Sequence, residues 1–388
     1  MNIFQNTEVA FQHKTNTQLK KAKFLFQCIQ NPILTKIGNS MLGFLVEINF
    51  PFVKSIVKNT IFEQFCGGES RKECLPVIDD LYKNKVHSIL DYSVEGKEDE
   101  KIFDQTCEEI ISIIQFSEHN ASMPFTVFKP TGFGRFALYE KVNQKQLLNE
   151  EETAEWKRVL NRFERVANEA KKANITIMID AEESWIQDAI DTIAEDLMRK
   201  YNVEKCIICN TLQMYRHDRL TYLKSEYKKA KEGNYFVGYK IVRGAYMEKE
   251  RKRATEMNYI SPIQNTKEET DMDYNKAIEI AFEHKETISL FAGTHNEKSC
   301  QLLINRMNEF NLNKDFHKIW FGQLFGMSDN LSFNLAKNGY NVAKYLPYGP
   351  IKEVIPYLMR RATENTSVAG QTGRELELLK QEIIRRKL

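Results

Sequence analysis

The run "ITIMID" (residues 175–180) is short, apolar and rich in β-branched residues, and it ends in an acid. A helical pattern follows it over residues 184–201, and a second run of the same kind, "CIICNTLQ" (206–213), comes next. Near-continuous apolar strands that are separated by helices are typical of a parallel sheet covered on both faces. This stretch therefore predicts repeated strand–helix units.

Eight such runs occur from residue 86 onward, with charged, helix-favouring segments between them. They are "VHSILDYS" (86–93), "PFTVFK" (124–129), "ITIMID" (175–180), "CIICNTLQ" (206–213), "YFVGYKIVR" (235–243), "ISLFAGTH" (288–295), "IWFGQL" (319–324) and "NVAKYL" (341–346). Eight repeats predict an α/β protein with a (β/α)8 barrel, a fold that typically takes about 250 residues. Because the preceding segment has a helical pattern, we expect a helical N-terminal arm (1–85) and a barrel domain (86–388).

An open doubly wound sheet is the alternative architecture, and it predicts a phosphate-binding fingerprint after the first strand. The one candidate is "GFGRFA" (132–137), which follows the second run instead. The acid expected about twenty residues further on, at a strand end, falls in the helical patch "NEEET" (149–153). A glycine-rich loop of a barrel explains this segment better.

Composition excludes several classes of protein. The chain has 388 residues and a formal net charge of +2, which gives no basic field for nucleic acid. Seven scattered cysteines suggest a reducing compartment, and the lone pair Cys206 and Cys209 lacks the further ligands of a zinc site, so we expect no metal. The N-terminus has no apolar core of a signal peptide, and the apolar stretch 41–53 is too short to span a bilayer.

A polar or ionisable side chain stands at the end of each run, where the chemistry of an α/β barrel gathers. In order these are Asp91, Lys129, Asp180, Gln213, Arg243, the pair Thr294–His295, Gln323 and Tyr345. Several have structural explanations, since an aspartate can cap the next helix and a tyrosine can lie buried. Together they predict where the site lies but not which reaction it performs.

The composition of this ring favours a bound cofactor. It contains cations but no nucleophile elbow and no metal-binding spacing. The loops "KIVRGAY" (240–246) and "GTHNEKS" (293–299) place glycine, cations and a helix N-terminus where a diphosphate would bind. A missing nucleophile, acid pair and metal suggest that a cofactor carries the chemistry.

Arg360 and Arg361 lie side by side about fifteen residues beyond the eighth run, in an amphipathic helical pattern. Neighbouring residues of a helix point about a hundred degrees apart, so they rarely share one surface salt bridge. Planar guanidinium donors suit a carboxylate, so both arginines are candidates for binding a small anion. A second pair, Arg385 and Arg386 in "IIRRK", is expected to be solvated.

The motifs together resemble proline dehydrogenase, also called proline oxidase, over about residues 86–370. They are "DYSVEG", "IDAEES", "NTLQMY", "KIVRGAYMEKER", "THNEKS", "FGQLFGM", "YLPYGP" and "PYLMRRATEN". The resemblance is to the monofunctional branch that includes the eukaryotic enzymes. It implies a distorted TIM-like barrel, noncovalent FAD over the strand ends, and oxidation of L-proline to Δ1-pyrroline-5-carboxylate, with a hydride passing to the flavin and the electrons then leaving to a membrane quinone.

The resemblance also implies roles for individual residues. Lys129, Arg360 and Arg361 match those that hold the substrate carboxylate, and Glu95 matches a gate paired with the first arginine. The other substrate-site positions are Asp180, Tyr246, Leu324 and Tyr345. The flavin contacts map to Gln213, Lys240, Arg243, Gly244, Ala245, Thr294, His295, Asn296, Gln323 and Glu364.

Three departures from the family pattern occur. Lys240 stands where many bacterial members carry arginine, Met247 replaces a common tryptophan, and the segment "MYRHDRL" (214–220) receives no role. Hydroxyproline oxidation and a non-catalytic carboxylate-binding barrel remain alternatives, although Tyr345 favours proline. We expect a bacterial cytoplasmic location with peripheral contact to the inner membrane, and a separate pyrroline-5-carboxylate dehydrogenase that receives the product.

Overall fold

The computed structural model describes residues 3–31, 53–92, 98–367 and 371–388. Eight strands form one sheet in the order β1-β8-β7-β6-β5-β4-β3-β2, a nearly closed barrel. They are β1 (His87–Tyr92), β2 (Phe125–Phe128), β3 (Thr176–Ile179), β4 (Ile208–Gln213), β5 (Val237–Val242), β6 (Ile288–Gly293), β7 (Ile319–Leu324) and β8 (Val342–Tyr348). The predicted (β/α)8 fold class is confirmed, and strand β7 has the predicted bounds.

The chain divides into two compact units. We call Gly96–Phe321 the central unit, and Met1–Glu95 together with Gly322–Leu388 the terminal unit. The division at residue 85 that the sequence suggested remains a prediction.

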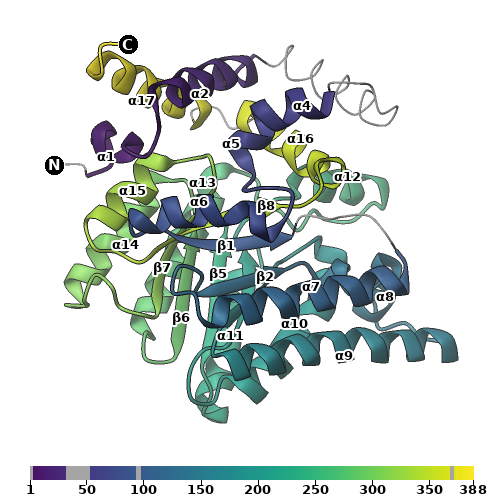
Figure 1. The fold of residues 1–388 in the computed structure, drawn as a ribbon. Helices are drawn as coiled ribbons and strands as arrows, with labels where there is room; N and C mark the ends of the chain where they lie inside the picture. Colours follow the sequence, from purple (N-terminus) through teal and green to yellow (C-terminus); the bar gives the residue numbers. More distant parts are fainter. Residues whose placement is uncertain (1–2, 32–52, 93–97, 368–370) are drawn as a thin grey trace. The chain divides into compact units, whose positions relative to one another are not determined.

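In the central unit, strands β2 to β6 are paired in parallel, each with the next along the chain. Eight helices follow or separate these strands in the described part of the unit, and α7 and α9 lie side by side (Figure 1). They are α7 (Glu100–Glu118), α8 (Phe136–Asn143), α9 (Glu150–Ala173), α10 (Ser184–Tyr201), α11 (Arg219–Gly233), α12 (Met247–Glu256), α13 (Lys267–Glu283) and α14 (Glu297–Glu309).

The long helix α9 shows why these segments are helical. Asn149 caps its N-terminus by accepting from the Glu152 backbone N–H at 2.8 Å, while the Glu152 side chain accepts from the Asn149 N–H at 3.1 Å. This capping box satisfies two N–H groups that the helix itself leaves open. The helix ends at Asn174, whose left-handed φ of 61° suits an asparagine C-cap.

The terminal unit contains the paired strands β1 and β8, which are parallel, and a helical core. Its helices are α1 (Thr7–Phe11), α2 (Asn16–Ile29), α4 (Val53–Val57), α5 (Glu63–Phe65), α6 (Arg71–Lys83), α15 (Asp329–Lys337), α16 (Ile351–Ser367) and α17 (Gln371–Arg385). Helix α2 packs against α17, and α1 against α15 (Figure 1). Among the described residues, we find no helix with the length and apolar character that crossing a membrane requires.

Buried charges link distant parts of the terminal unit. The fully buried Lys344 of β8 contacts Asp329 at 2.9 Å and donates to the Met327 carbonyl at 2.7 Å. Lys14 and His13 lie 3.4 and 3.5 Å from the same carboxylate, and neighbouring charges hold the pKa of Asp329 well below its usual range despite burial. The carboxylate therefore joins the N-terminal segment to α15 and β8.

The C-terminal arginine pair was expected to be solvated, and that expectation was wrong for Arg386. Its guanidinium donates to the Phe11 and Lys14 carbonyls, each at 2.8 Å, and to Glu382 at 2.7 Å. Arg385 is the more exposed of the two and contacts Glu382 at 2.8 Å. The sequence could not show that the last helix returns to the N-terminus, where carbonyl groups need donors.

Glu375 predicts a pH dependence of the terminal unit. Its buried carboxyl accepts the Ser328 N–H, and burial raises its pKa to about 7, with Asp329 adding to the shift. A raised folded-state pKa gives stability that is present below the unfolded value near 4.5 and is lost as the pH rises through 7. Glu375→Gln should therefore lose less stability than the parent between pH 5 and pH 8. Over this range, the free energy of unfolding of the variant should rise relative to that of the parent by on the order of 3 kcal/mol.

Denaturant unfolding of both proteins at pH 5 and pH 8 measures this difference. The exposed Glu377 on the same helix gives the control variant Glu377→Gln, which should show no pH-dependent gain. An equal pH dependence in the parent and in Glu375→Gln would contradict the assignment.

Candidate active site

Three side chains form one row across strands of the central unit. The register pairs Ile179 of β3 with Asn210 of β4, and Thr211 of β4 with Lys240 of β5. Asp180, Thr211 and Lys240 therefore stand at one level of the sheet. The Lys240 ammonium forms an ion pair with the Asp180 carboxylate, and their side chains are only 7% and 16% exposed.

Asp180 and Lys240, the two ends of this row, are held in place in different ways. The Asp180 N–H donates to the Phe128 carbonyl at 3.0 Å, which ties the end of β3 to the end of β2, next to Lys129. Lys240 lies within β5 and is buried. A buried charge is stable only when a partner is in place, so the pair holds both side chains in fixed positions.

Thr211 is the member of the row that the sequence analysis missed. It is 3% exposed, and its hydroxyl oxygen has no hydrogen-bond partner among the described residues. A buried hydroxyl without a partner costs free energy unless a ligand or water satisfies it. Alternation could have found it, because Thr211 lies two residues before Gln213, on the same strand face.

Gln213 connects the loops that follow β3 and β5. Its amide nitrogen donates to the Glu182 carbonyl at 2.7 Å, and its amide oxygen accepts the Ala245 N–H at 3.0 Å. The side chain is 2% exposed, so both contacts are shielded from water. This predicted flavin contact therefore also positions two loops at the carboxyl edge of the sheet.

Glu182 holds the turn after Lys129 and was not predicted. Its carboxylate accepts the Thr131 backbone N–H at 2.9 Å and the Thr131 hydroxyl at 2.7 Å. Burial raises the pKa of Glu182 to about 7, while the Thr131 hydrogen bonds oppose this rise. Two donors from one residue keep the short 3-10 turn of residues 130–132 in place behind Lys129.

Arg243 braces the loop after β5. Its Nε donates to Asp271 at 2.5 Å, its Nη1 to the Thr294 hydroxyl at 2.7 Å and its Nη2 to the Ser299 hydroxyl at 3.0 Å. The guanidinium also lies 4.5 Å from the centre of the Tyr274 ring. Three of its five N–H donors are used within the protein, so only the remainder can serve a ligand.

The local packing explains why position 244 is a glycine. Its φ is +144°, and a Cβ there would lie 2.4 Å from the Tyr215 ring. The Tyr215 N–H donates to the Arg243 carbonyl at 2.7 Å, which brings the two loops together. Glycine is required here for the packing of Tyr215 as well as for the approach of any ligand.

The helix start after β6 has its own cap. The Asn296 side chain accepts the N–H groups of Lys298 at 2.9 Å and Ser299 at 3.1 Å, and Thr294 accepts the Asn296 N–H at 3.1 Å. His295 lies between Thr294 and Asn296, two residues before α14. Part of the anion-binding capacity expected of this helix N-terminus is therefore already used.

Tyr246 occupies the N-cap position of α12, and the Lys249 ammonium lies 5.5 Å from the centre of its ring. Lys249 also contacts Glu183 at 2.8 Å, so the first turn of α12 is tied to the loop after β3. Tyr246 thus precedes a helix whose first turn contacts the loop after β3 through an ion pair.

The remaining predicted residues belong to the terminal unit. Gln323 accepts the Ser332 hydroxyl at 2.9 Å, and Leu324 packs against the helical core. Arg360 and Arg361 are half-buried on α16, and the Arg361 guanidinium lies 5.3 Å from the centre of the Tyr357 ring. The Glu364 side chain and the whole of Glu95 lie outside the described residues.

Three expected strand ends, Asp91, Gln323 and Tyr345, lie inside their strands, and Gln323 is the last but one residue of β7. Strand β8 continues to Tyr348, three residues beyond Tyr345, which is 8% exposed. Strand β1 continues to Tyr92, so Asp91 is its last but one residue. None of the three is the last residue of its strand.

The described residues contain no group of three or more side chains that could hold a metal ion. Burial raises the pKa of the Cys206 thiol to about 12 and that of Cys209 well above its ordinary value. These cysteines are protonated at neutral pH and are therefore poor nucleophiles.

Comparison with known proteins shows the family of the chain. The family model described as proline dehydrogenase matches residues 74–374. The chain belongs to the proline dehydrogenase family. This is a family of flavin-dependent oxidoreductases, as the motifs around Asp180, Lys240 and Arg361 implied.

Individual relatives support the same assignment. The carbapenem antibiotics biosynthesis protein CarD of Pectobacterium carotovorum is 35% identical over 322 residues, which are 83% of each chain. Proline dehydrogenase 1, mitochondrial, of Homo sapiens is 40% identical over 240 residues, 61% of this chain and 40% of the human protein. The mitochondrial enzyme of Dictyostelium discoideum is 31% identical over 389 residues.

Solved structures share the fold. Proline utilization A (PutA) from Bdellovibrio bacteriovorus, inactivated by N-propargylglycine, superposes with a TM-score of 0.79 at 18% sequence identity. The match covers 97% of this chain and 43% of that one, so the chain spans less than half the length of this structural relative.

Energetic coupling between Lys240 and Asp180 can be measured. Removing one partner leaves the other charge buried without its ion pair, whereas removing both does not. We therefore expect Asp180→Asn and Lys240→Gln to destabilise the protein by less together than the sum of the single changes. The coupling should be about 1.5–3 kcal/mol, as for contacting residues of one network.

A double-mutant cycle with denaturant unfolding at pH 7 gives this coupling. The exposed pair Lys252 and Glu256 on α12 provides a matched cycle, which should show a much smaller value. Additive effects at Lys240 and Asp180 would be inconsistent with a buried ion pair.

Proposed function

We propose that this member of the proline dehydrogenase family oxidises L-proline to Δ1-pyrroline-5-carboxylate with FAD as cofactor and a membrane quinone as electron acceptor. The observation that carries the proposal is the buried row of Asp180, Thr211 and Lys240, in a chain whose family is established. The row places an ammonium, a carboxylate and a buried hydroxyl near the carboxyl ends of parallel strands, and ligands of such sheets bind beyond those ends.

The donor set of the central unit fits a flavin. Lys240 supplies a fixed positive charge, the buried Thr211 hydroxyl has no partner among the described residues, and Gln213 and Arg243 hold the loops on either side. FAD, when bound, supplies the acceptor for the hydride that leaves the substrate carbon. A positioned ammonium next to a cofactor that gains negative charge is the kind of electrostatic stabilisation that enzymes use most.

Arg360 and Arg361 are the residues we assign to the substrate carboxylate, on the basis of the family resemblance. Both residues are half-buried on α16. Bidentate arginine contacts orient a carboxylate as well as bind it, and orientation of this kind lowers the barrier by several kcal/mol. Tyr345 is assigned to the selection of proline over hydroxyproline.

Flavin absorbance gives the test of the proposed function. The purified protein should show a flavin band that bleaches when L-proline is added without oxygen, and the product should appear in solution. A colourless protein, or a yellow one that L-proline does not bleach, would contradict the proposal. The ratio of turnover on proline and hydroxyproline then tests the role of Tyr345.

The acceptor and the location form a second, separable part of the proposal. We place the protein in a bacterial cytoplasm with peripheral contact to the inner membrane, where quinone is dissolved, and the product passes to a separate pyrroline-5-carboxylate dehydrogenase. Turnover with a short-chain soluble quinone and fractionation of cell membranes test these points. The similarity to CarD, a protein named for carbapenem biosynthesis, makes the fate of the product a question separate from its formation.

Arg361→Met should retain bound flavin and lose proline turnover by at least two orders of magnitude, because the lost charged hydrogen bonds are worth roughly 1.5–3 kcal/mol each and also orient the substrate. The flavin spectrum and kcat/KM measure the two effects separately.

The exposed Lys352 on the same helix provides the control. Lys352→Met removes a positive charge from α16 and should leave kcat/KM within about twofold, as expected for an exposed charge. Near-normal turnover in a yellow Arg361→Met protein would end the carboxylate assignment.

A further inference from the structure

The turn that follows Lys129 is held from three sides by buried side chains. Residues 130–132 form a short 3-10 helix with Lys129 as its N-cap, and the Lys129 carbonyl accepts the Gly132 N–H at 2.9 Å. Lys129 itself is half-buried, and the register of β2 and β3 places it level with Asp180. It is the lysine that the family resemblance assigns to the proline carboxylate. The position of this turn therefore decides where that ammonium stands.

Two of the three sides are helices. The Tyr139 hydroxyl of α8 donates to the Pro130 carbonyl at 2.8 Å. The Arg162 guanidinium of α9 donates to the Phe133 carbonyl, also at 2.8 Å. Tyr139 and Arg162 are fully buried, and the Phe133 ring stacks on Phe128 with ring centres 4.6 Å apart. These contacts hold the first residue of the turn and the residue that closes it.

The third side is Glu182, from the loop after β3, and it holds the middle of the turn. Its carboxylate accepts both the N–H and the hydroxyl of Thr131, at 2.9 and 2.7 Å. Burial raises the pKa of Glu182, and the Lys129 ammonium opposes part of this rise. The ammonium of Lys129 therefore lies within electrostatic reach of the carboxyl that holds its turn.

The backbone of Glu182 is fixed as firmly as its side chain. The Gln213 amide nitrogen donates to its carbonyl at 2.7 Å, and its own N–H donates to the Gln187 amide oxygen at 2.9 Å. Gln187 donates in turn to Asp191 at 2.8 Å, and both of these α10 residues are buried. The carboxylate is therefore presented to Thr131 from a backbone that cannot easily shift.

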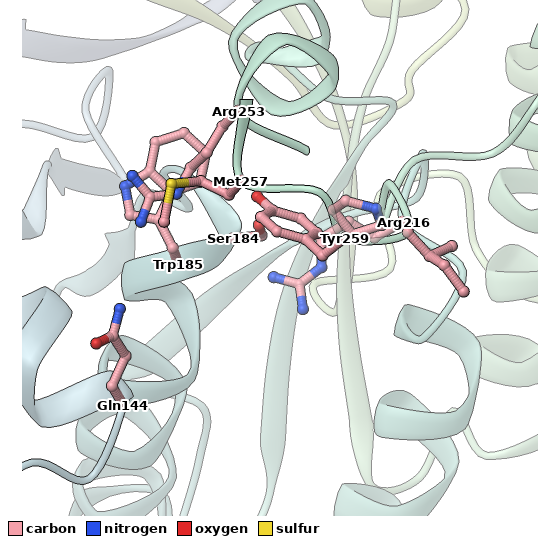
Figure 2. A pocket seen from close by; sticks show the side chains of 9 residues that line it. Gln144, Ser184, Trp185, Arg216, Arg253, Met257 and Tyr259 are labelled. Carbon is pink, nitrogen blue, oxygen red and sulfur yellow. The ribbon is translucent and has the colours of Figure 1, made fainter. Parts of the chain in front are cut away.

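This contact is separate from the pocket that lies nearby in the central unit. Figure 2 shows Ser184 and Trp185 among the side chains that line that pocket, which has a volume of about 430 Å³. Neither Glu182 nor Thr131 lines it. The Ser184 N–H and hydroxyl each donate to Glu250 at 2.6 Å. The chain after β3 is thus tied to α12 at Ser184 and to the turn after β2 at Glu182.

We propose that Glu182 is a positioning residue of the proline site, which holds Lys129 in place for the substrate carboxylate through its two contacts with Thr131. The role of Lys129 belongs to the proposed function, on which this role of Glu182 rests. A binding group that is misplaced by about 1 Å can cost on the order of a hundredfold in rate, so the turn needs such a restraint.

The hydrogen-bonding chemistry of the carboxyl group predicts which substitutions are tolerated. A neutral carboxyl can still accept an N–H and exchange a hydrogen bond with a hydroxyl, so the contacts with Thr131 do not require the charge. Glutamine has the same shape and also offers an acceptor and a donor. Alanine offers neither and leaves the Thr131 N–H and hydroxyl without their partner.

Binding of cyclopentanecarboxylate tests this role, because the acid has the ring size and carboxylate of proline but no amine to be oxidised. Isothermal titration calorimetry on the purified full-length protein gives the dissociation constant. Lys129→Met and Glu182→Ala should each weaken binding roughly tenfold or more. Glu182→Gln should stay within about threefold of the parent, since it keeps both contacts. With L-proline as substrate, KM should follow the same order.

A second variant keeps the test informative if Glu182→Ala fails to fold. Thr131→Val removes the hydroxyl but keeps the backbone N–H, and it should weaken binding of the probe by about threefold or more. The double variant should bind no more weakly than Glu182→Ala alone, because both changes break the same contact.

Glu226 of α11 provides the matched control. Its carboxyl is also buried, at 1% exposure, but it forms an ion pair with Lys229 of its own helix. Glu226→Ala should leave the affinity for cyclopentanecarboxylate within about twofold of the parent, as expected for a change that shares no partner with Lys129. This variant separates the positioning of Lys129 from the general cost of losing a buried carboxyl.

Several results would overturn the role of Glu182. These are parent-like binding in Glu182→Ala or Thr131→Val, equal losses in Glu182→Gln and Glu182→Ala, and an equal loss in Glu226→Ala. A parent that does not bind the probe, or that binds it as tightly as Lys129→Met, would remove the role of Lys129 and that of Glu182 with it. Bleaching of the flavin by L-proline would still support the proposed function in that case, so the two failures are distinguishable.

Discussion

A lysine that is removed from water needs a carboxylate in place, and the contact between Lys240 and Asp180 meets this need in the central unit. The contact spans β3 and β5, so it forms only if β4 holds both neighbours in one register. A slip of one residue would turn one of the two side chains to the other face of its strand. The ion pair and the register therefore require each other, and together they place Thr211 between two fixed charges.

The terminal unit also contains a buried lysine that is paired with a carboxylate. Lys344 lies on β8 without any exposure, and Asp329 at the start of α15 is its carboxylate. His13 and Lys14 bring the N-terminal segment to the same carboxylate, and His13 stacks on Phe333 with ring centres 4.0 Å apart. Residues more than 300 positions apart in the sequence are thereby joined at one buried charge, which explains why the N-terminal helices pack with α15 and α17.

Much of the fold could be predicted because strand and helix periods are local properties of the sequence. The errors at strand ends have specific causes. Strand β4 begins at Ile208 and not at residue 206, because the Asn202 side chain accepts the N–H groups of Ile207 and Ile208 at 2.8 Å each. Strand β8 runs through Pro347, a residue that normally ends a strand, and the Pro347 carbonyl still accepts the Gly67 N–H at 2.8 Å.

Sequence patterns could place the ends of strands, as at Asp180, Gln213 and Arg243, and the roles assigned to these residues stay predictions. Contacts between residues that are distant in sequence were not predicted. Glu182 holds Thr131 across 51 positions, and Arg243 reaches Ser299 across 56 positions. The periodicity of the sequence does not reveal such contacts, because they depend on the register of the sheet and on the packing of the loops.

The burial of the segment "RHDR" (216–219) could not be inferred from its charge alone. No role was assigned to this segment from the sequence, and charged side chains are usually exposed, yet Arg216 and Arg219 are 6% and 3% exposed. Arg219 is satisfied, since it contacts Asp191 at 2.6 Å and also Asp218. Arg216 has the same kind of burial but retains one donor without a partner. Both arginines are held by carboxylates, Arg216 by Asp218 of the same turn and Arg219 also by Asp191 of α10, and burial of this kind depends on partners that a run of polar residues does not reveal.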